Sequence, residues 1–391
     1  MKAGAGQVPR AGYSLPRAFY TYPAIFERHL ERMLLRHWFC AGQVSSLANR
    51  GDYFLVDLGS ESVIVCRGAD GDVHALLNVC HHRGSRVCVA RSGSAIGGGF
   101  TCRYHAWSYG LDGRLRAARE MPPSFRREDV GLQALRVQVL EGLIFITFSA
   151  TPSALDDAAR ALANAAGTHG WANAKVAHRA SFEIDANWKL AVENYMECYH
   201  CQPSHQEFAR QHVYARPATQ RAQLERAARE RSAALGICIA NVDGYGLNAG
   251  HVTASPDGKP VASLMGAFPE HDGSATYFDV GPVSTFPACA DHGLIYRFIP
   301  RSVDRTDMEV IWLVHKNAVE GRDYQLERLT WLWQVTSVED KQIIERNQEG
   351  VNSRYYEPGP YTLQEEYASR YRSHVMVATA QSSAASAGNP G

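Results

Sequence analysis

Two cysteines and two histidines with metal-ligand spacing lie between residues 80 and 105 of the 391-residue chain. Cys80 and His82 form a C-x-H pair, and Cys102 and His105 form a C-x-x-H pair further along the chain. Two thiolates and two imidazoles suit either a tetrahedral zinc ion or a [2Fe–2S] cluster with both cysteines on one iron and both histidines on the other. The spacing therefore predicts one metal centre held by these four side chains.

The residues that flank the two pairs favour the iron cluster over zinc. Arg83-Gly84 follows the first pair and Ala106-Trp107 follows the second. Together they resemble the signature C-x-H-R-G … C-x-x-H-x-W of the Rieske [2Fe–2S] domain. His81 lies between the ligands of the first pair, but alternate residues of an extended loop share a face, so His81 is predicted to point away.

A second group of metal-ligand residues lies between residues 187 and 208. His200 and His205 are five residues apart, a separation that would place them on different sides of an unbroken helix. Pro203 lies between them and is predicted to bend or end the helix, so that the two imidazoles converge. Two histidines and a distant carboxylate form the facial triad of mononuclear non-haem iron oxygenases. The alternative is a capping role for two histidines at a helix end.

This second stretch resembles the catalytic helix of the α (oxygenase) subunit of Rieske non-haem iron oxygenases. The residues that carry the resemblance are Asn187-Trp188-Lys189, Glu193-Asn194, Glu197-Cys198-Tyr199-His200-Cys201 and His205. The likeness extends over nearly the whole chain. It is strongest with the branch that acts on quaternary ammonium compounds, which includes glycine betaine monooxygenase and proline betaine demethylase. Glutamate at position 197 suits that branch.

The third iron ligand must come from the C-terminal half, and two neighbouring acids are candidates. On a helix predicted from about residue 323 to 348, Asp340 shares a face with Trp333 and Ile344. Glu339 occupies a different, partly apolar face, so periodicity does not choose between them. The resemblance implies that Asp340 is the ligand.

The resemblance also implies how the two metals communicate. It places Glu197 as a bridge between the cluster of one subunit and the mononuclear iron of its neighbour in a homotrimer. The carboxylate would accept a hydrogen bond from a histidine at each metal. Cys198 and Cys201 flank His200, and their rotation around a helix indicates packing residues rather than ligands.

Composition limits the cellular setting and the partners. Lys plus Arg and Asp plus Glu both number 40, so the formal charge is zero, which argues against a nucleic-acid surface. No apolar run is long enough to span a bilayer, and no apolar signal segment follows Met1. Nine cysteines in a chain of this length do not indicate a disulfide framework. We therefore expect a cytoplasmic protein without a membrane segment.

The pattern of elements predicts an α+β protein with an all-β Rieske domain and a catalytic domain of helices on an antiparallel sheet. The predicted divisions are an N-terminal segment packed on the catalytic domain (1–44), the Rieske domain (45–150), the catalytic domain (151–380) and a disordered tail (381–391). Strands are expected at 53–56, 63–66, 73–76, 143–148, 182–185, 294–299 and 309–314, and helices at 23–38, within 151–175, from 187 and at 323–348.

The resemblance implies an enzyme that uses O₂ and electrons from NAD(P)H, delivered through a separate flavin- or ferredoxin-type reductase. Hydroxylation of an N-methyl group of a betaine-like substrate would give a carbinolamine that collapses to formaldehyde and the demethylated amine. The alternative reaction is hydroxylation of an aromatic ring. A trimethylammonium group favours aromatic surroundings, and residues 205–290 are predicted to line its pocket. A zinc-stabilised binding module and a pure electron carrier remain alternatives, but neither needs the second metal site.

Overall fold

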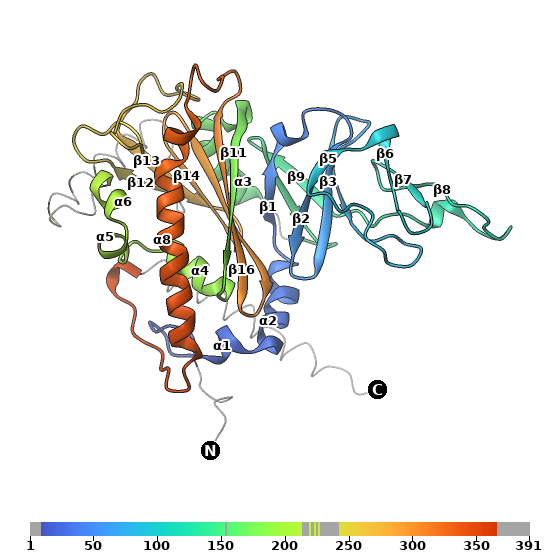
Figure 1. The fold of residues 1–391 in the computed structure, drawn as a ribbon, viewed down its shortest axis with the longest axis horizontal. Helices are drawn as coiled ribbons and strands as arrows, with labels where there is room; N and C mark the ends of the chain where they lie inside the picture. Colours follow the sequence, from blue (N-terminus) through green and yellow to red (C-terminus); the bar gives the residue numbers. More distant parts are fainter. Residues whose placement is uncertain are drawn as a thin grey trace.

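The computed structural model describes residues 9–152, 155–212 and 242–365, with isolated positions 219, 223 and 226. An all-β part and a part with helices against a six-stranded antiparallel sheet lie side by side (Figure 1). The predicted α+β class is confirmed. The predicted tail, 381–391, lies outside the described residues, and no described helix is long and apolar enough to cross a membrane.

The N-terminal segment is helical but shorter than predicted. It contains α1 (Ala18–Thr21), α2 (Pro23–His29) and a π-helical turn, η1 (Leu30–Leu34). The helix predicted to reach residue 38 ends at Leu34, and a turn then leads into β1, which begins at Phe39 and pairs with β10. Tyr20 and the apolar side chains of η1 are buried in the same core as α4 of the helical part.

The all-β part consists of three small antiparallel sheets with strand orders β1-β10-β9, β4-β3-β2-β5 and β6-β7-β8. Their bounds are β1 (Phe39–Gln43), β2 (Asp52–Leu58), β3 (Glu61–Arg67), β4 (Val73–Leu77), β5 (Ser92–Ser94), β6 (Gly99–Thr101), β7 (Ser108–Gly110), β8 (Leu115–Ala117), β9 (Arg136–Leu140) and β10 (Leu143–Thr147). The alternating burial of β2 follows from its alternating apolar residues, which face one core. The four strands predicted in this region are confirmed.

The helical part is organised around one sheet with the order β11-β16-β15-β14-β13-β12. Its strands are β11 (Ala174–Ile184), β12 (Val242–Gly246), β13 (Ser274–Asp279), β14 (Ser284–Ala288), β15 (Gly293–Ser302) and β16 (Arg305–His315). Its helices are α3 (Asp156–Thr168), α4 (Trp188–Tyr195), α5 (Cys201–Ser204), α6 (Gln206–Gln211) and α8 (Leu326–Asn352). Short 3₁₀ turns lie at Val44–Leu47, Ile96–Gly98, Arg127–Asp129, Trp171–Asn173 and Leu363–Glu365.

Helix α8 runs along one face of this sheet and packs against β11, α4 and α6 (Figure 1). The residues that it buries recur at helical spacing, as an amphipathic stripe requires. They include Leu329, Leu332, Trp333, Thr336, Ser337, Asp340, Ile344 and Val351. The one acid in that stripe is Asp340, so the predicted inward direction of this side chain is confirmed.

Helix α4 begins where predicted, because the Asn187 side chain caps it by accepting a hydrogen bond from the backbone N–H of Lys189 at 3.1 Å. Lys189 is fully buried, and its Nζ lies 3.4 Å from Nδ1 of His29. Burial lowers the pKa of Lys189 to about 7, against an opposing attraction from Glu193. A buried amine of this kind costs the folded state stability whenever it is protonated.

Replacing this amine should stabilise the protein in a pH-dependent way. Between about pH 7 and pH 10.5 the unfolded chain holds a proton on Lys189 that the folded chain does not, so native stability rises with pH in that window. Lys189→Met lacks this dependence. We expect it to raise the free energy of unfolding by on the order of 4 kcal/mol below pH 7, with the gain shrinking by about 1.4 kcal/mol per pH unit above it.

Urea unfolding of both proteins between pH 6 and pH 9 measures this gain. Lys341→Met is the matched control, because Lys341 is partly exposed on α8 and pairs with Glu345. The control should change stability by no more than about 1 kcal/mol, with no trend over this range. A stability difference for Lys189→Met that is independent of pH would contradict a buried, proton-poor amine.

Candidate active site and its two metal centres

The two ligand pairs of the all-β part lie next to each other. Cys80 and Cys102 are buried, whereas His82 and His105 are exposed. The two imidazole rings lie 4.5 Å apart between centroids, and the His82 ring stacks on Trp107 at 4.7 Å. The thiols therefore face the core and the imidazoles face outward, which suits a cluster whose histidine-bound iron exchanges electrons with a partner.

Each pair lies on a tight turn closed by backbone hydrogen bonds. The Gly84 N–H donates to the carbonyl of Cys80, and Gly84 has a φ of +74°, which glycine adopts without strain. The Ala106 N–H donates to the carbonyl of Cys102 in the second turn. The intervening His81 turns away, as predicted. Its Nδ1 lies 3.0 Å from the carbonyl oxygen of Gly131.

The chemistry of the thiols fits metal ligation. Burial raises the pKa of the Cys102 thiol, but hydrogen bonds from the backbone N–H groups of Tyr104 and His105 outweigh it and lower the pKa below its usual value. The Cys80 sulfur lies 3.0 Å from the hydroxyl of Tyr109. Donors aimed at the Cys102 sulfur favour its thiolate, the form that binds iron.

The second centre brings together His200, His205 and Asp340. Oδ1 of Asp340 lies 2.9 Å from Nε2 of His205 and 3.4 Å from Nε2 of His200. One possible ligand atom from each of the three residues lies within 4.8 Å of the others. Two imidazole nitrogens and one carboxylate oxygen converging on one point fit the facial triad of non-haem iron.

The charges around this centre favour a cation between the three side chains. Burial lowers the pKa of His200, but Asp340 and Glu197 outweigh it and raise the pKa to about 9. Burial raises the pKa of Asp340, but the two histidines outweigh it and lower the pKa. The carboxylates here favour positive charge on the neighbouring histidines. A divalent cation bound between the three side chains would supply that positive charge in place of protons.

The backbone reaches this geometry differently from the predicted bent helix. α4 ends at Tyr195, and His200 lies on a non-helical turn before α5. Pro203 lies inside the single turn of α5, which ends before His205. The Glu197 carboxylate accepts hydrogen bonds from the backbone N–H groups of Tyr199 and His200 and lies 2.5 Å from Nδ1 of His200. The turn, rather than helical spacing, holds Glu197 against His200.

The two candidates for the third ligand take different positions. Asp340 faces the Nε2 atoms, and its side chain is 4% exposed. Glu339 lies on the opposite edge of the His205 ring, with Oε2 2.9 Å from Nδ1, and its side chain is 31% exposed. The group of residues that converges on one point includes Asp340 and not Glu339.

Cys201 lies in the core that contains α4 and Cys198 packs against that core, as predicted, and neither belongs to the group of residues that converges on the metal position. The two residues form a disulfide, with their Cα atoms 4.9 Å apart. Residues 196–200 form a turn between α4 and α5 in place of the predicted continuous helix, and the disulfide was not expected from the sequence. Cα atoms at this separation lie within the range that a disulfide spans.

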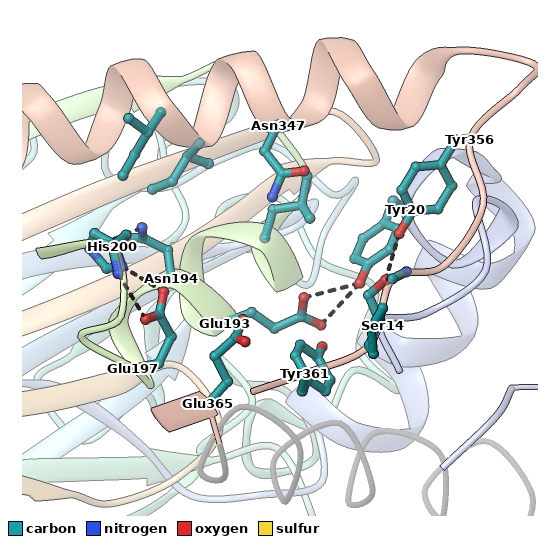
Figure 2. Close-up of a pocket in the computed structure, with 15 residues that line it drawn as sticks. Ser14, Tyr20, Glu193, Asn194, Glu197, His200, Asn347, Tyr356, Tyr361 and Glu365 are labelled. Carbon is teal, nitrogen blue, oxygen red and sulfur yellow. Dashed lines mark hydrogen bonds and ion pairs between the residues drawn. The ribbon is translucent and has the colours of Figure 1, made fainter. Parts of the chain in front are cut away.

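A cavity of about 360 Å³ opens beside Glu197 and His200 (Figure 2). Ser14 and Tyr356 line its far end, and the Tyr20 hydroxyl there donates to Glu193 at 3.0 Å. Sequence reasoning did not place the N-terminal and C-terminal segments at this site. Residues 205–290, predicted to line a pocket, contribute none of this cavity's lining, and most of 213–241 lies outside the described residues.

Comparisons with known proteins agree with these two centres. Residues 37–139 match the family model of the Rieske [2Fe-2S] domain, and residues 171–381 match that of the ring hydroxylating alpha subunit (catalytic domain). The chain is 36% identical over 373 residues to the glycine betaine monooxygenase oxygenase subunit of Pseudomonas aeruginosa, covering 91% of this chain and 86% of the relative. It is also 36% identical over 207 residues to the carnitine monooxygenase oxygenase subunit of Acinetobacter baumannii, which covers 51% of this chain and 55% of that relative.

Solved structures share the whole fold. A quaternary ammonium Rieske monooxygenase superposes with a TM-score of 0.74 at 25% identity and covers 94% of this chain and 95% of that one. Naphthalene 1,2-dioxygenase from Rhodococcus sp. shares the fold, with a TM-score of 0.69 at 18% identity. The superposition covers 94% of this chain and 95% of that one. The catalytic-domain match spans more than half of the chain. This chain therefore belongs to the Rieske non-haem iron oxygenases, as an α (oxygenase) subunit that carries a [2Fe–2S] cluster and a mononuclear iron.

Proposed function

We propose that this protein is the oxygenase component of an N-demethylating monooxygenase for a betaine-like quaternary ammonium compound. The observation that carries the proposal is the 36% identity, over 91% of the chain, to a glycine betaine monooxygenase subunit. A fold shared with a quaternary ammonium Rieske monooxygenase supports it. We assign 45–150 to the cluster domain and 151–380 to the catalytic domain.

We assign Cys80, His82, Cys102 and His105 to the cluster, and His200, His205 and Asp340 to the iron. When bound, the cluster relays electrons from a separate reductase, and the iron uses them with O₂ to oxygenate a C–H bond. The chain's own residues bind and orient these groups. His200, His205 and Asp340 would supply three ligands, and an iron held by them would have further coordination positions for substrate and O₂.

A group of aromatic side chains packs beside His205, one of the proposed iron ligands. The Tyr195 ring lies 4.9 Å from that of Tyr296 and 4.8 Å from that of Phe298. Trp333 packs between Tyr296 and Phe208, and the Phe208 ring neighbours that of His205. Aromatic faces attract quaternary ammonium groups through their quadrupoles.

We further propose a homotrimer in which Glu197 connects the two metals across a subunit boundary. Glu197 contacts an iron-ligand histidine and lines an open cavity, so the neighbour's exposed His82 or His105 has a route to its carboxylate. The solved structure of the quaternary ammonium Rieske monooxygenase compared above gives insight into electron transfer between its subunits. Hydrogen bonds to a shared carboxylate orient both histidines and link the two centres.

Substrate-dependent formaldehyde release tests the proposed reaction. The holoenzyme with its reductase should release formaldehyde and form the demethylated amine with glycine betaine, proline betaine, choline or carnitine. Simple aromatic acids serve as the comparison. Ring-hydroxylated product without formaldehyde would instead identify an aromatic-ring oxygenase.

A further inference from the structure

The His205 ring is held on both sides by neighbouring residues of one helix. Asp340 Oδ1 lies 2.9 Å from Nε2, and Glu339 Oε2 lies 2.9 Å from Nδ1. Both acids belong to α8, whose 27 residues include them near its middle. We propose that Glu339 is a positioning residue, which fixes the tautomer and orientation of His205 for metal binding without being a ligand.

The physical reason lies in the two nitrogens of a neutral imidazole. One nitrogen carries the proton and donates, and the other offers a lone pair to the metal. A carboxylate at Nδ1 accepts that proton's hydrogen bond and leaves the Nε2 lone pair directed at Asp340 and the metal position. A hydrogen bond to an ionised acceptor also increases the basicity of the ring as a ligand.

The position of Glu339 distinguishes this role from ligation. Its carboxylate contacts the ring nitrogen opposite to the one that faces Asp340. Glu197 contacts Nδ1 of His200 in the same way at 2.5 Å, so each iron-ligand histidine has its own carboxylate. The two carboxylates differ in surroundings, because Glu197 lines the open cavity described above and Glu339 does not. Glu339 is therefore placed to act on the iron through His205, whereas Glu197 lies against His200 beside the cavity.

Metal titration tests the role independently of turnover. The cluster-loaded protein is stripped of mononuclear iron with a chelator and titrated with Fe(II) or Co(II) under anaerobic conditions. We expect Glu339→Ala to weaken metal binding roughly tenfold to a hundredfold, the usual effect of removing such a partner. Glu339→Gln keeps an oxygen that can accept the hydrogen bond from His205, so it should bind metal more tightly than Glu339→Ala does. The visible spectrum of bound Co(II) should keep its intensity, because the ligand set is unchanged.

Glu349→Ala is the matched control, since it removes an exposed carboxylate from the same helix. The control should bind metal as the native protein does. Native-like affinity in Glu339→Ala would overturn the proposal. A Co(II) spectrum altered as in Asp340→Ala would overturn it too, because Glu339 would then be a ligand. The inference rests on the proposed iron site but not on the substrate, so a failed formaldehyde assay leaves it intact.

Discussion

Asp340→Asn is expected to lower product formation by more than roughly a hundredfold, beyond the usual effect of removing a supporting hydrogen bond. The substitution keeps the shape of the side chain and removes the negative charge from the only acid of the triad, which is buried against both imidazoles. A neutral amide binds Fe(II) more weakly than a carboxylate does. Formaldehyde release and mononuclear iron content measure the effect.

The cluster should be unaffected by this change, because its ligands lie in the other part of the chain. Its visible absorbance and its rate of reduction by the reductase are therefore internal controls. Glu349→Gln, on the exposed side of the same helix, should retain native turnover. Full mononuclear iron and native turnover in Asp340→Asn would show that the third ligand lies elsewhere.

Glu197→Gln is expected to nearly abolish turnover while both metal centres stay filled. The amide keeps the length of the side chain but loses the charge that strengthens the hydrogen bond to His200. In the proposed trimer the same carboxylate also accepts a hydrogen bond from a cluster histidine of the neighbouring subunit. In the variant, electrons should therefore reach the cluster but not pass on to the mononuclear iron. Stopped-flow absorbance should show normal reduction of the cluster and slow reoxidation with O₂ and substrate.

Glu365→Gln is the control for this variant, because Glu365 lines the same cavity and does not contact an iron-ligand histidine. Mixed assemblies test the subunit boundary directly. Trimers that combine Cys102→Ser subunits with His200→Ala subunits should regain part of the activity that each variant lacks alone. No recovery in verified mixed trimers would refute electron transfer between neighbours.

The four proposed cluster ligands and the two histidines of the second centre were accessible to sequence reasoning because their spacing is local. Cys80 and His82, like Cys102 and His105, lie on single turns whose geometry depends on neighbouring residues. The inward direction of Asp340 followed from helical periodicity, which holds along the whole of α8. Assigning Asp340 as the ligand required the family resemblance, since Glu339 satisfied the pattern equally well.

Only the tertiary structure decided how distant segments complete the site. The contact of Glu339 with His205 joins residues 134 positions apart, and that of Lys189 with His29 spans 160 positions. Such contacts depend on how α8, α4 and the N-terminal helices pack on one another, which side-chain periodicity does not encode. The disulfide of Cys198 and Cys201 was missed for a related reason, because a non-helical turn replaced the predicted helix there. Local spacing indicated which cysteines and histidines could bind metal, and packing determined which carboxylates lie against the histidines of the second centre.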